Sequence, residues 1–272
     1  MQTYIEIRNE KIPALGYGTF LLQGNHCLTG VADALSIGYR HIDTAQAYKN
    51  EEEVGTAIKN SSVNRHDIFI TTKVTTGNFS KENFLASVVT SLKKLQVDSV
   101  DLILLHWPSD DEVNKAAVEQ LVLAQQKGYA RLIGVSNFTL SQMEAARNQA
   151  DIFCNQVEYH PYFAQKKILA YLQSHNMMLT AYRPLADGKI LADDLIKSLA
   201  QKYNRAAAQI VLRWFLQQKD VSVIPKASDE KHRKENFDVF DFELSEKDMQ
   251  DISELDAGKR MVNPPWSPKW DD

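Results

Sequence analysis

Apolar and polar positions follow two alternating patterns along the chain. Short, mainly apolar runs, typical of buried strands, are followed by longer segments in which apolar residues recur every three to four positions, as in helices packed on a sheet. Ala207, Ile210, Val211 and Trp214 form one such helical stripe, at positions i, i+3, i+4 and i+7. Because strands that alternate with helices form parallel βα units, the pattern predicts an α/β protein.

Eight apolar runs define the expected sheet. Helical periodicity separates them, for example over residues 83–95 and 112–127, and this predicts a (β/α)8 TIM barrel. Alternation on either side of an Asn-Glu turn predicts an N-terminal β-hairpin over residues 4–12, outside the barrel. The expected barrel strands cover residues 15–18, 39–42, 68–73, 100–105, 132–135, 153–157, 178–182 and 221–224.

The length and the uninterrupted pattern favour one domain. The chain has 272 residues, and barrels of about 250 residues form a single domain. No linker or low-complexity segment breaks the alternation. We therefore expect one barrel domain over residues 1–272.

Composition excludes several classes of partner. The formal net charge of −4 provides no basic field for a polyanion, so we expect no nucleic acid partner. No apolar run approaches the roughly 20 residues needed to span a bilayer, and the N-terminus lacks the apolar core of a signal peptide. Two cysteines, Cys27 and Cys154, give neither a disulfide framework nor metal-ligand spacing. These features predict a cytoplasmic protein with reduced thiols and no metal or membrane partner.

Four residue types with complementary chemistry lie at the ends of three successive expected strands. Asp43, Lys73 and His106 end or follow these strands, and Tyr48 lies in the loop after the first of them. Taken singly, each has an ordinary structural explanation: a capping carboxylate, a lysine reaching solvent, a core histidine and a half-buried aromatic. However, active sites of barrels lie at the C-terminal ends of the strands. We therefore consider the four residues together, as the tetrad.

The tetrad fits the chemistry of carbonyl reduction. Asp43 would hold the Lys73 ammonium, and that charge would lower the pKa of the Tyr48 phenol. Tyr48 could then pass its proton to a carbonyl oxygen as a hydride reaches the carbon. His106 would be a second donor to the same oxygen.

Further motifs give the chain a resemblance to a known family. In their order and spacing the motifs resemble those of the aldo-keto reductases, and the stretch from Asp43 to Glu51 is most similar to that of the bacterial 2,5-diketo-D-gluconate reductases. The resemblance implies an oxidoreductase acting on CH-OH groups, with NADPH as the hydride donor. The motifs are Leu-Leu-His-Trp-Pro (104–108), Gly-Val-Ser-Asn-Phe (134–138), Asn-Gln-Val-Glu-Tyr-His-Pro (155–161) and Val-Ile-Pro-Lys (223–226).

The dinucleotide must be held without a Rossmann fingerprint, because the glycine pair at residues 16–18 lacks the third glycine. Ser136, Asn137 and Gln156 offer donors and acceptors for a carboxamide, and the family uses these positions for it, although strand-end turns would also explain them. The resemblance implies that Tyr182 stacks on the nicotinamide. Arg183 replaces the usual serine and would place a cation near the pyrophosphate.

The adenosine end departs most from the family pattern. Lys226 can meet a 2′-phosphate as a point charge, but Ala227 replaces a serine and His232 occupies an arginine position. We expect NADPH to be preferred, with NADH a weaker alternative; a solvated helix start at residues 231–234 is the competing interpretation. The expected cofactor-binding residues are Gly18, Thr19, Ser136, Asn137, Gln156, Tyr182, Arg183, Pro184, Leu185, Lys226, Ala227, Ser228, His232, Glu235 and Asn236.

The expected substrate pocket suits small polar carbonyls such as 2,5-diketo-D-gluconate or methylglyoxal. Thr75 stands where many family members carry a tryptophan. A small polar residue at this position would widen the pocket or admit water to it. A tail with Trp266 and Trp270 would either cover the pocket or pack on the barrel exterior. The expected substrate-contacting residues are Phe20, Tyr48, Thr75, His106 and Trp107.

Two other functions are compatible with these residues. One is a noncatalytic NADP-binding regulatory barrel. The other is a Schiff-base aldolase with Lys73 as the nucleophile. We expect the reductase, acting as a monomer.

Overall fold

The computed structural model describes residues 2–271 and contains a hairpin followed by a parallel sheet. β1 pairs with β2 in antiparallel fashion, with Ile5 opposite Ile12. The strands are β1 (Tyr4–Ile7), β2 (Glu10–Pro13), β3 (Tyr17–Gly18), β4 (His41–Asp43), β5 (Phe69–Val74), β6 (Val100–Leu105), β7 (Ala130–Ser136), β8 (Cys154–Glu158), β9 (Met178–Tyr182) and β10 (Val221–Val223).

Eight parallel strands follow one another in sequence order across the sheet, from β3 to β10. The two ends of the sheet are joined by hydrogen bonds: the Gly16 amide donates to the Val223 carbonyl at 2.8 Å, and the Val223 amide donates to the Ala14 carbonyl at 2.8 Å. The predicted hairpin and eight parallel strands are therefore confirmed, in an arrangement consistent with a (β/α)8 barrel. The first strand is shorter than predicted, and β4 ends one residue later than predicted.

The sheet ends meet so closely that one position requires glycine. A Cβ atom on Gly18 would lie 2.9 Å from the Ile224 carbonyl oxygen, which is backbone and cannot move aside. Without that Cβ, the Gly18 amide donates to the Pro225 carbonyl at 3.0 Å. Gly18 is thus needed where the first strand meets the last.

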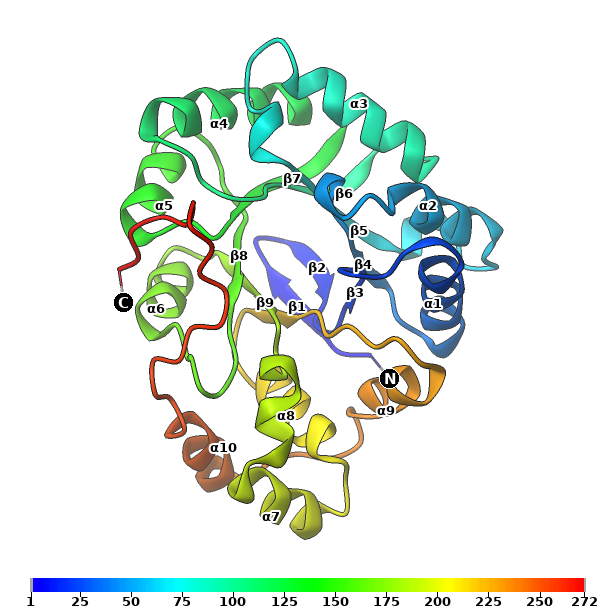
Figure 1. The fold of residues 1–272 in the computed structure, drawn as a ribbon, viewed down its shortest axis with the longest axis vertical. Helices are drawn as coiled ribbons and strands as arrows, with labels where there is room; N and C mark the ends of the chain where they lie inside the picture. Colours follow the sequence, from blue (N-terminus) through cyan, green and yellow to red (C-terminus); the bar gives the residue numbers. More distant parts are fainter. Residues whose placement is uncertain (1, 272) are drawn as a thin grey trace.

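Helices surround the sheet as a ring, with the hairpin inside it (Figure 1). The α-helices are α1 (Gly24–Ile37), α2 (Glu51–Asn60), α3 (Phe84–Leu95), α4 (Asp111–Gln126), α5 (Leu140–Arg147), α6 (Lys166–Ser174), α7 (Asp194–Tyr203), α8 (Ala207–Leu216), α9 (Glu230–Phe237) and α10 (Glu246–Ser253). Short 3-10 helices are η1 (Gln46–Tyr48), η2 (Arg65–Asp67), η3 (Thr76–Asn78) and η4 (Ala186–Ala192).

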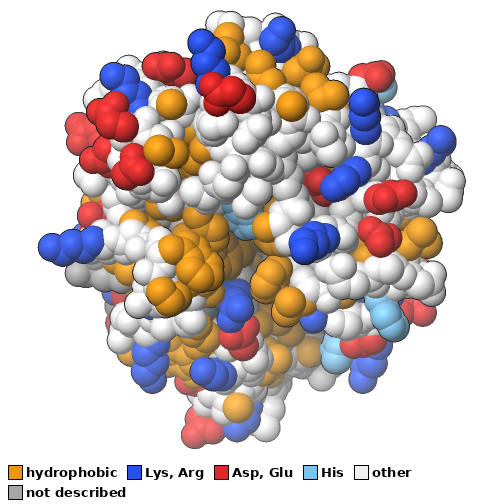
Figure 2. Space-filling view, turned by 45° about the horizontal axis from the view of Figure 1, so that its top comes forward, with side chains coloured by type: hydrophobic (Ala, Val, Ile, Leu, Met, Phe, Trp, Pro, Cys, Tyr) orange, Lys and Arg blue, Asp and Glu red, His pale blue; other side chains and the backbone are white. Residues whose placement is uncertain are grey.

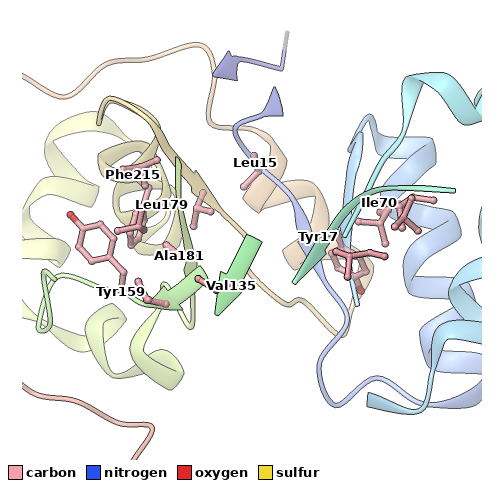
Figure 3. Packing of buried hydrophobic residues seen from close by; sticks show 14 of the residues in the cluster. Leu15, Tyr17, Ile70, Val135, Tyr159, Leu179, Ala181 and Phe215 are labelled. Atoms are coloured by element: carbon pink, nitrogen blue, oxygen red, sulfur yellow. The ribbon is translucent and has the colours of Figure 1, made fainter. Parts of the chain in front are cut away.

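Two apolar clusters stabilise this architecture. The larger lies between strands and helices; Figure 3 shows Leu179 and Phe215 packed together in one part of it. The smaller joins hairpin residues such as Ile12, which is fully buried, to Phe69 and Phe153 near the starts of their strands. The hairpin therefore closes the end of the sheet at which the strands begin.

Membrane and metal features are absent from the part of the chain that the structure describes. No helix within residues 2–271 is long and apolar enough to cross a bilayer. In the same range, no group of three or more His, Cys, Asp or Glu side chains is placed to hold a metal ion. Cys27 and Cys154 are buried free thiols, and burial raises the pKa of each.

Candidate active site

A buried ion pair lies where β4 and β5 end. The Lys73 ammonium is fully buried, and its nitrogen lies 2.5 Å from Asp43 Oδ1. It also donates to the Thr44 carbonyl at 2.9 Å and to the Tyr48 hydroxyl at 3.3 Å. Each of the three protons of the ammonium thus has an acceptor, which offsets the cost of burying the charge.

The turn that carries Tyr48 is held by one partly buried and one fully buried side chain. Two residues separate η1 from the end of β4, and Gln46 within η1 accepts hydrogen bonds from the Thr75 amide at 3.1 Å and from Asn78 Nδ2 at 3.0 Å. Asn50, fully buried, donates to the carbonyls of Thr19 and Leu22. These bonds fix the backbone on both sides of Tyr48.

His106 faces Tyr48 directly after β6. The two rings meet edge to face with centroids 5.5 Å apart, and Phe20 lies on another side of Tyr48 at 5.1 Å. The His106 amide donates to the Val74 carbonyl at 3.1 Å, so this residue continues the pairing of β6 with β5. The structure thereby brings the four predicted tetrad residues together at the ends of three neighbouring strands.

The electrostatics of the site differ from the prediction made for Tyr48. Burial, with the Asp43 carboxylate adding to it, raises the pKa of Tyr48 well above its usual value. The prediction that Lys73 leaves the phenol with a lowered pKa is therefore wrong, because desolvation of the phenolate outweighs the nearby cation. Burial also lowers the pKa of Lys73, an effect that Asp43 opposes. Tyr48 is thus a neutral phenol at physiological pH.

His106 is a neutral imidazole. Burial first and the Lys73 ammonium second lower its pKa to about 3. A neutral imidazole can donate one N–H bond to a ligand oxygen.

The tetrad opens into a cavity of about 1420 Å³. Figure 2 shows a hollow in this face of the molecule, with hydrophobic side chains gathered on both sides of it. Asp43, Tyr48 and His106 line the cavity, as do the predicted substrate residues Phe20, Thr75 and Trp107. Lys73 lies beneath this surface.

The residues predicted to hold a carboxamide form one hydrogen-bonded chain beside the tetrad. Gln156 Nε2 donates to Asp43 Oδ2 at 2.8 Å, and the Ser136 hydroxyl donates to the Gln156 carbonyl at 2.8 Å. Asn137 Nδ2 donates to the His106 carbonyl at 3.1 Å, and the Tyr182 hydroxyl donates to Asn137 Oδ1 at 2.7 Å. All four side chains line the cavity.

The chain beyond β9 adds a charged pair to the same wall. Arg183 lies in the left-handed region, with φ of 51°, and its guanidinium pairs with Asp187 at 2.5 Å. Both residues line the cavity together with Pro184 and Leu185.

Comparison with known proteins decides the family. The model of the aldo/keto reductase family matches residues 14–257. The chain belongs to this family. The predicted resemblance is therefore confirmed, and the protein is an aldo/keto reductase.

Several of its relatives carry names of reductases of small carbonyl compounds. Methylglyoxal reductase DkgB of Escherichia coli O157:H7 is 41% identical over 266 residues, which cover 96% of this chain and 99% of the relative. Glyoxal reductase of Bacillus subtilis is 41% identical over 256 residues, covering 92% and 91%. A crystal structure of a protein assigned as a 2,5-diketo-D-gluconic acid reductase B superposes with a TM-score of 0.97, at 44% identity, covering 100% of this chain and 98% of that one.

In this aldo/keto reductase, the predicted cofactor-binding residues extend beyond the cavity. Gly18 and Lys226 line it, and Lys226 Nζ lies 2.9 Å from the Ser228 hydroxyl. His232 is exposed at the start of α9 and pairs with the Asp229 carboxylate. The other predicted cofactor-binding residues of this region are not among the described residues that line the cavity. They are Thr19, Ala227, Ser228, His232, Glu235 and Asn236.

Arg233 does not take the place of the missing arginine at position 232. Its side chain is 5% exposed, and its guanidinium pairs with Asp33 of α1. The guanidinium also donates to the carbonyls of Ala227 and Ser228. Arg233 therefore fixes the segment after Lys226 to the barrel and does not face solvent.

Sequence reasoning placed the tail with Trp266 either over the pocket or on the barrel exterior, but it missed Glu158, the residue that binds this tail. The tail from Met261 to Pro268 supplies much of one wall, and Glu158 binds the start of that tail. Glu158 lies inside the Asn-Gln-Val-Glu-Tyr-His-Pro motif, which was the available signal. Its partners lie about 100 residues away in sequence, so no local pattern identifies them.

Proposed function

We propose that this aldo/keto reductase uses NADPH to reduce aldehydes and ketones to alcohols, on a (β/α)8 barrel that forms a single domain over residues 1–272. The observation that supports this best is the buried Lys73 ammonium, held by Asp43 and 3.3 Å from the Tyr48 phenol at the cavity wall. This arrangement places a proton donor and its electrostatic support beside a space large enough for a dinucleotide and a carbonyl compound.

In this mechanism the bound nicotinamide supplies a hydride. Tyr48, a neutral phenol, gives its proton from the hydroxyl oxygen to the carbonyl oxygen. The Lys73 ammonium then stabilises the phenolate that remains, since opposite charges about 3 Å apart attract strongly in a dry site. His106 donates an N–H bond to the same carbonyl oxygen and orients it.

The cofactor assignment rests on donors and acceptors of the matching type. A carboxamide offers two N–H donors and one acceptor, and Ser136, Asn137 and Gln156 provide both kinds of group within one hydrogen-bonded chain. The Tyr182 ring lies next to this chain at the cavity wall. Lys226 supports preference for a 2′-phosphate, and hence for NADPH over NADH.

Small polar carbonyls remain the proposed substrates, in particular methylglyoxal and 2,5-diketo-D-gluconate. The names of the relatives support this class. Thr75 at the cavity wall supports it too, because a small polar side chain leaves space and admits water. We also propose a monomeric protein in the cytoplasm.

The Schiff-base aldolase is disfavoured by the position of Lys73. Its nitrogen is fully buried and donates to Asp43, Thr44 and Tyr48, whereas a Schiff base requires a free, accessible amine. A noncatalytic regulatory barrel is disfavoured by the assembled tetrad.

Purified protein tests the proposed function directly. We expect NADPH oxidation to depend on added methylglyoxal or 2,5-diketo-D-gluconate, with the corresponding alcohol as product. If the protein binds NADPH but oxidises it with neither of these carbonyl compounds, the result would instead support the regulatory barrel. Borohydride trapping of a substrate adduct on Lys73 would support the aldolase.

Preference between the two cofactors tests the adenosine end. His232→Arg is expected to tighten NADPH by about tenfold and leave NADH unchanged, because arginine adds a charge-assisted contact to the 2′-phosphate. Lys226→Met is expected to act in the opposite direction. Dissociation constants from quenching of tryptophan fluorescence measure both effects. Equal changes for NADPH and NADH would show that these residues do not meet the phosphate.

A further inference from the structure

The C-terminal segment lies along the mouth of the cavity without regular secondary structure. In Figure 1 it runs from α10 past α6 towards α5. It contains no helix or strand between Met261 and Trp270. Its residues that line the cavity are Met261, Val262, Asn263, Pro264, Trp266, Ser267 and Pro268.

One carboxylate binds the start of this segment. The Met261 amide donates to Glu158 Oε1 at 2.6 Å, and the Val262 amide donates to Glu158 Oε2 at 2.7 Å. His160 Nε2 lies 2.9 Å from Oε1, and the side chains of Glu158 and His160 are completely buried. Two adjacent backbone groups of the tail are therefore bound at a single point.

The charge state of Glu158 strengthens these bonds. Burial opposes ionisation, but the His160 imidazole and the Met261 and Val262 amides together hold the pKa of Glu158 below its usual value. Bonds from N–H groups to an ionised carboxylate are stronger than those to a neutral acceptor. Glu158 thus binds the tail as a carboxylate.

The far end of the segment is bound both to the barrel and to the tail itself. The Trp270 ring packs against Trp107 with centroids 6.2 Å apart, and its indole nitrogen donates to Asn263 Oδ1 at 2.9 Å. The Asp271 carboxylate accepts a hydrogen bond from the Leu140 amide. The residues between the two attachment points therefore cross the cavity as a supported span.

Glu158 connects this span to the catalytic side of the cavity. It lies two residues after Gln156 on β8, and side chains two apart in a strand point to the same face. Gln156 donates to Asp43 of the tetrad. The same strand thus carries one residue at the tetrad and, one step nearer the mouth, the residue that binds the tail.

The span presents apolar surface to the cavity mouth. Trp266 is 70% exposed although it lines the cavity, and on the opposite loop Phe20 and Leu21 are 43% and 68% exposed. Large apolar side chains exposed around a cavity are available for ligand contact. A carbonyl compound with an apolar arm offers surface for contact with these side chains, and a short carbonyl compound lacks that surface.

We propose that Glu158 is a positioning residue that fixes the tail across the cavity mouth and thereby sets the affinity for carbonyl compounds with an apolar arm. This inference rests on the proposed reductase function. It adds a substrate class, 2-oxoaldehydes with an aryl or alkyl arm, and assigns their arm to the wall that carries Trp266. Short carbonyl compounds depend on the tetrad and not on this wall.

The test combines a structural and a kinetic measurement on Glu158→Gln. Hydrogen exchange of the Met261 and Val262 amides should accelerate by about tenfold or more, since glutamine is neutral and turns an NH2 group towards one of them. KM for phenylglyoxal should rise by about tenfold, within the range for loss of apolar pocket contacts. KM for methylglyoxal and kcat for both compounds should change by less than about twofold.

Two further variants make the result specific. Glu144→Gln removes an exposed glutamate of α5 and should alter neither exchange nor kinetics. Trp266→Ala should raise KM for phenylglyoxal and leave hydrogen exchange of the Met261 amide unchanged. This variant tests whether Trp266 contacts the substrate even if Glu158→Gln fails to fold.

Several outcomes would overturn the inference. Unchanged exchange in Glu158→Gln would show that the carboxylate does not hold the tail. An equal loss of kcat for both compounds would indicate a general structural role, and an unchanged KM for phenylglyoxal in Trp266→Ala would remove the wall from recognition. If the wild-type protein reduces neither compound, the proposed function fails and the specificity role with it, while exchange still decides whether Glu158 binds the tail.

Discussion

Tyr48→Phe is expected to lower kcat for carbonyl reduction by about 10² to 10⁴, the range for loss of general acid catalysis. Within residues 2–271, the Tyr48 phenol is the only proton donor of the tetrad whose oxygen accepts a hydrogen bond from the Lys73 ammonium, at 3.3 Å. Phenylalanine retains the ring and its edge-to-face contact with His106, so the cavity should keep its shape. Steady-state kinetics with NADPH and methylglyoxal measure the loss.

Cofactor binding should separate chemistry from folding in this variant. The phenol acts on the carbonyl oxygen, so the dissociation constant of NADPH should change by less than about threefold. Tyr4→Phe, which removes an exposed phenol from the hairpin, is the matched control and should retain wild-type activity. If Tyr48→Phe keeps more than about a tenth of the wild-type kcat, the proton comes from another group.

Lys73→Met is expected to abolish measurable turnover and to lower the free energy of unfolding by about 3–5 kcal/mol, the cost of removing one partner from a buried ion pair. It leaves the Asp43 carboxylate 2% exposed, with the Gln156 amide as the remaining side-chain hydrogen-bond donor to it within residues 2–271. It also removes the cation that stabilises the Tyr48 phenolate. Urea unfolding and steady-state kinetics measure the two losses.

A double variant distinguishes the two roles of the lysine. Asp43→Asn combined with Lys73→Met removes both charges and should recover much of the lost stability, because no buried charge is left without a partner. Its activity should stay as low as that of Lys73→Met. Lys115→Met, on the exposed part of α4, is the control for loss of a lysine. Equal stability of the single and double variants would contradict this account of the ion pair.

The order of strands and the strand-end positions of Asp43, Lys73 and His106 could be predicted because they follow from local patterns. Apolar runs identify strands, and parallel strands bring their C-terminal ends to one edge. The resemblance added the family, which the comparisons confirm. The roles assigned to individual site residues remain predictions.

Properties that depend on burial could not be predicted in this way. The direction of the Tyr48 pKa is set by desolvation, and the sequence does not show how dry a loop residue becomes. The same holds for Arg233, which lies in the helix start that the sequence allowed to be solvated, whereas the structure buries it against Asp33. The contact of Glu158 with Met261 spans 103 positions and depends on the path of the folded tail.

In this enzyme the hairpin and the residues proposed to carry out the chemistry lie at opposite ends of the strands. The hairpin packs its isoleucines against the starts of the strands, while the tetrad lies at the ends of the strands. Substitutions at two such distant places contribute nearly additively. Natural or laboratory selection can therefore change thermal stability through the hairpin and substrate range through the cavity, with little effect of one on the other.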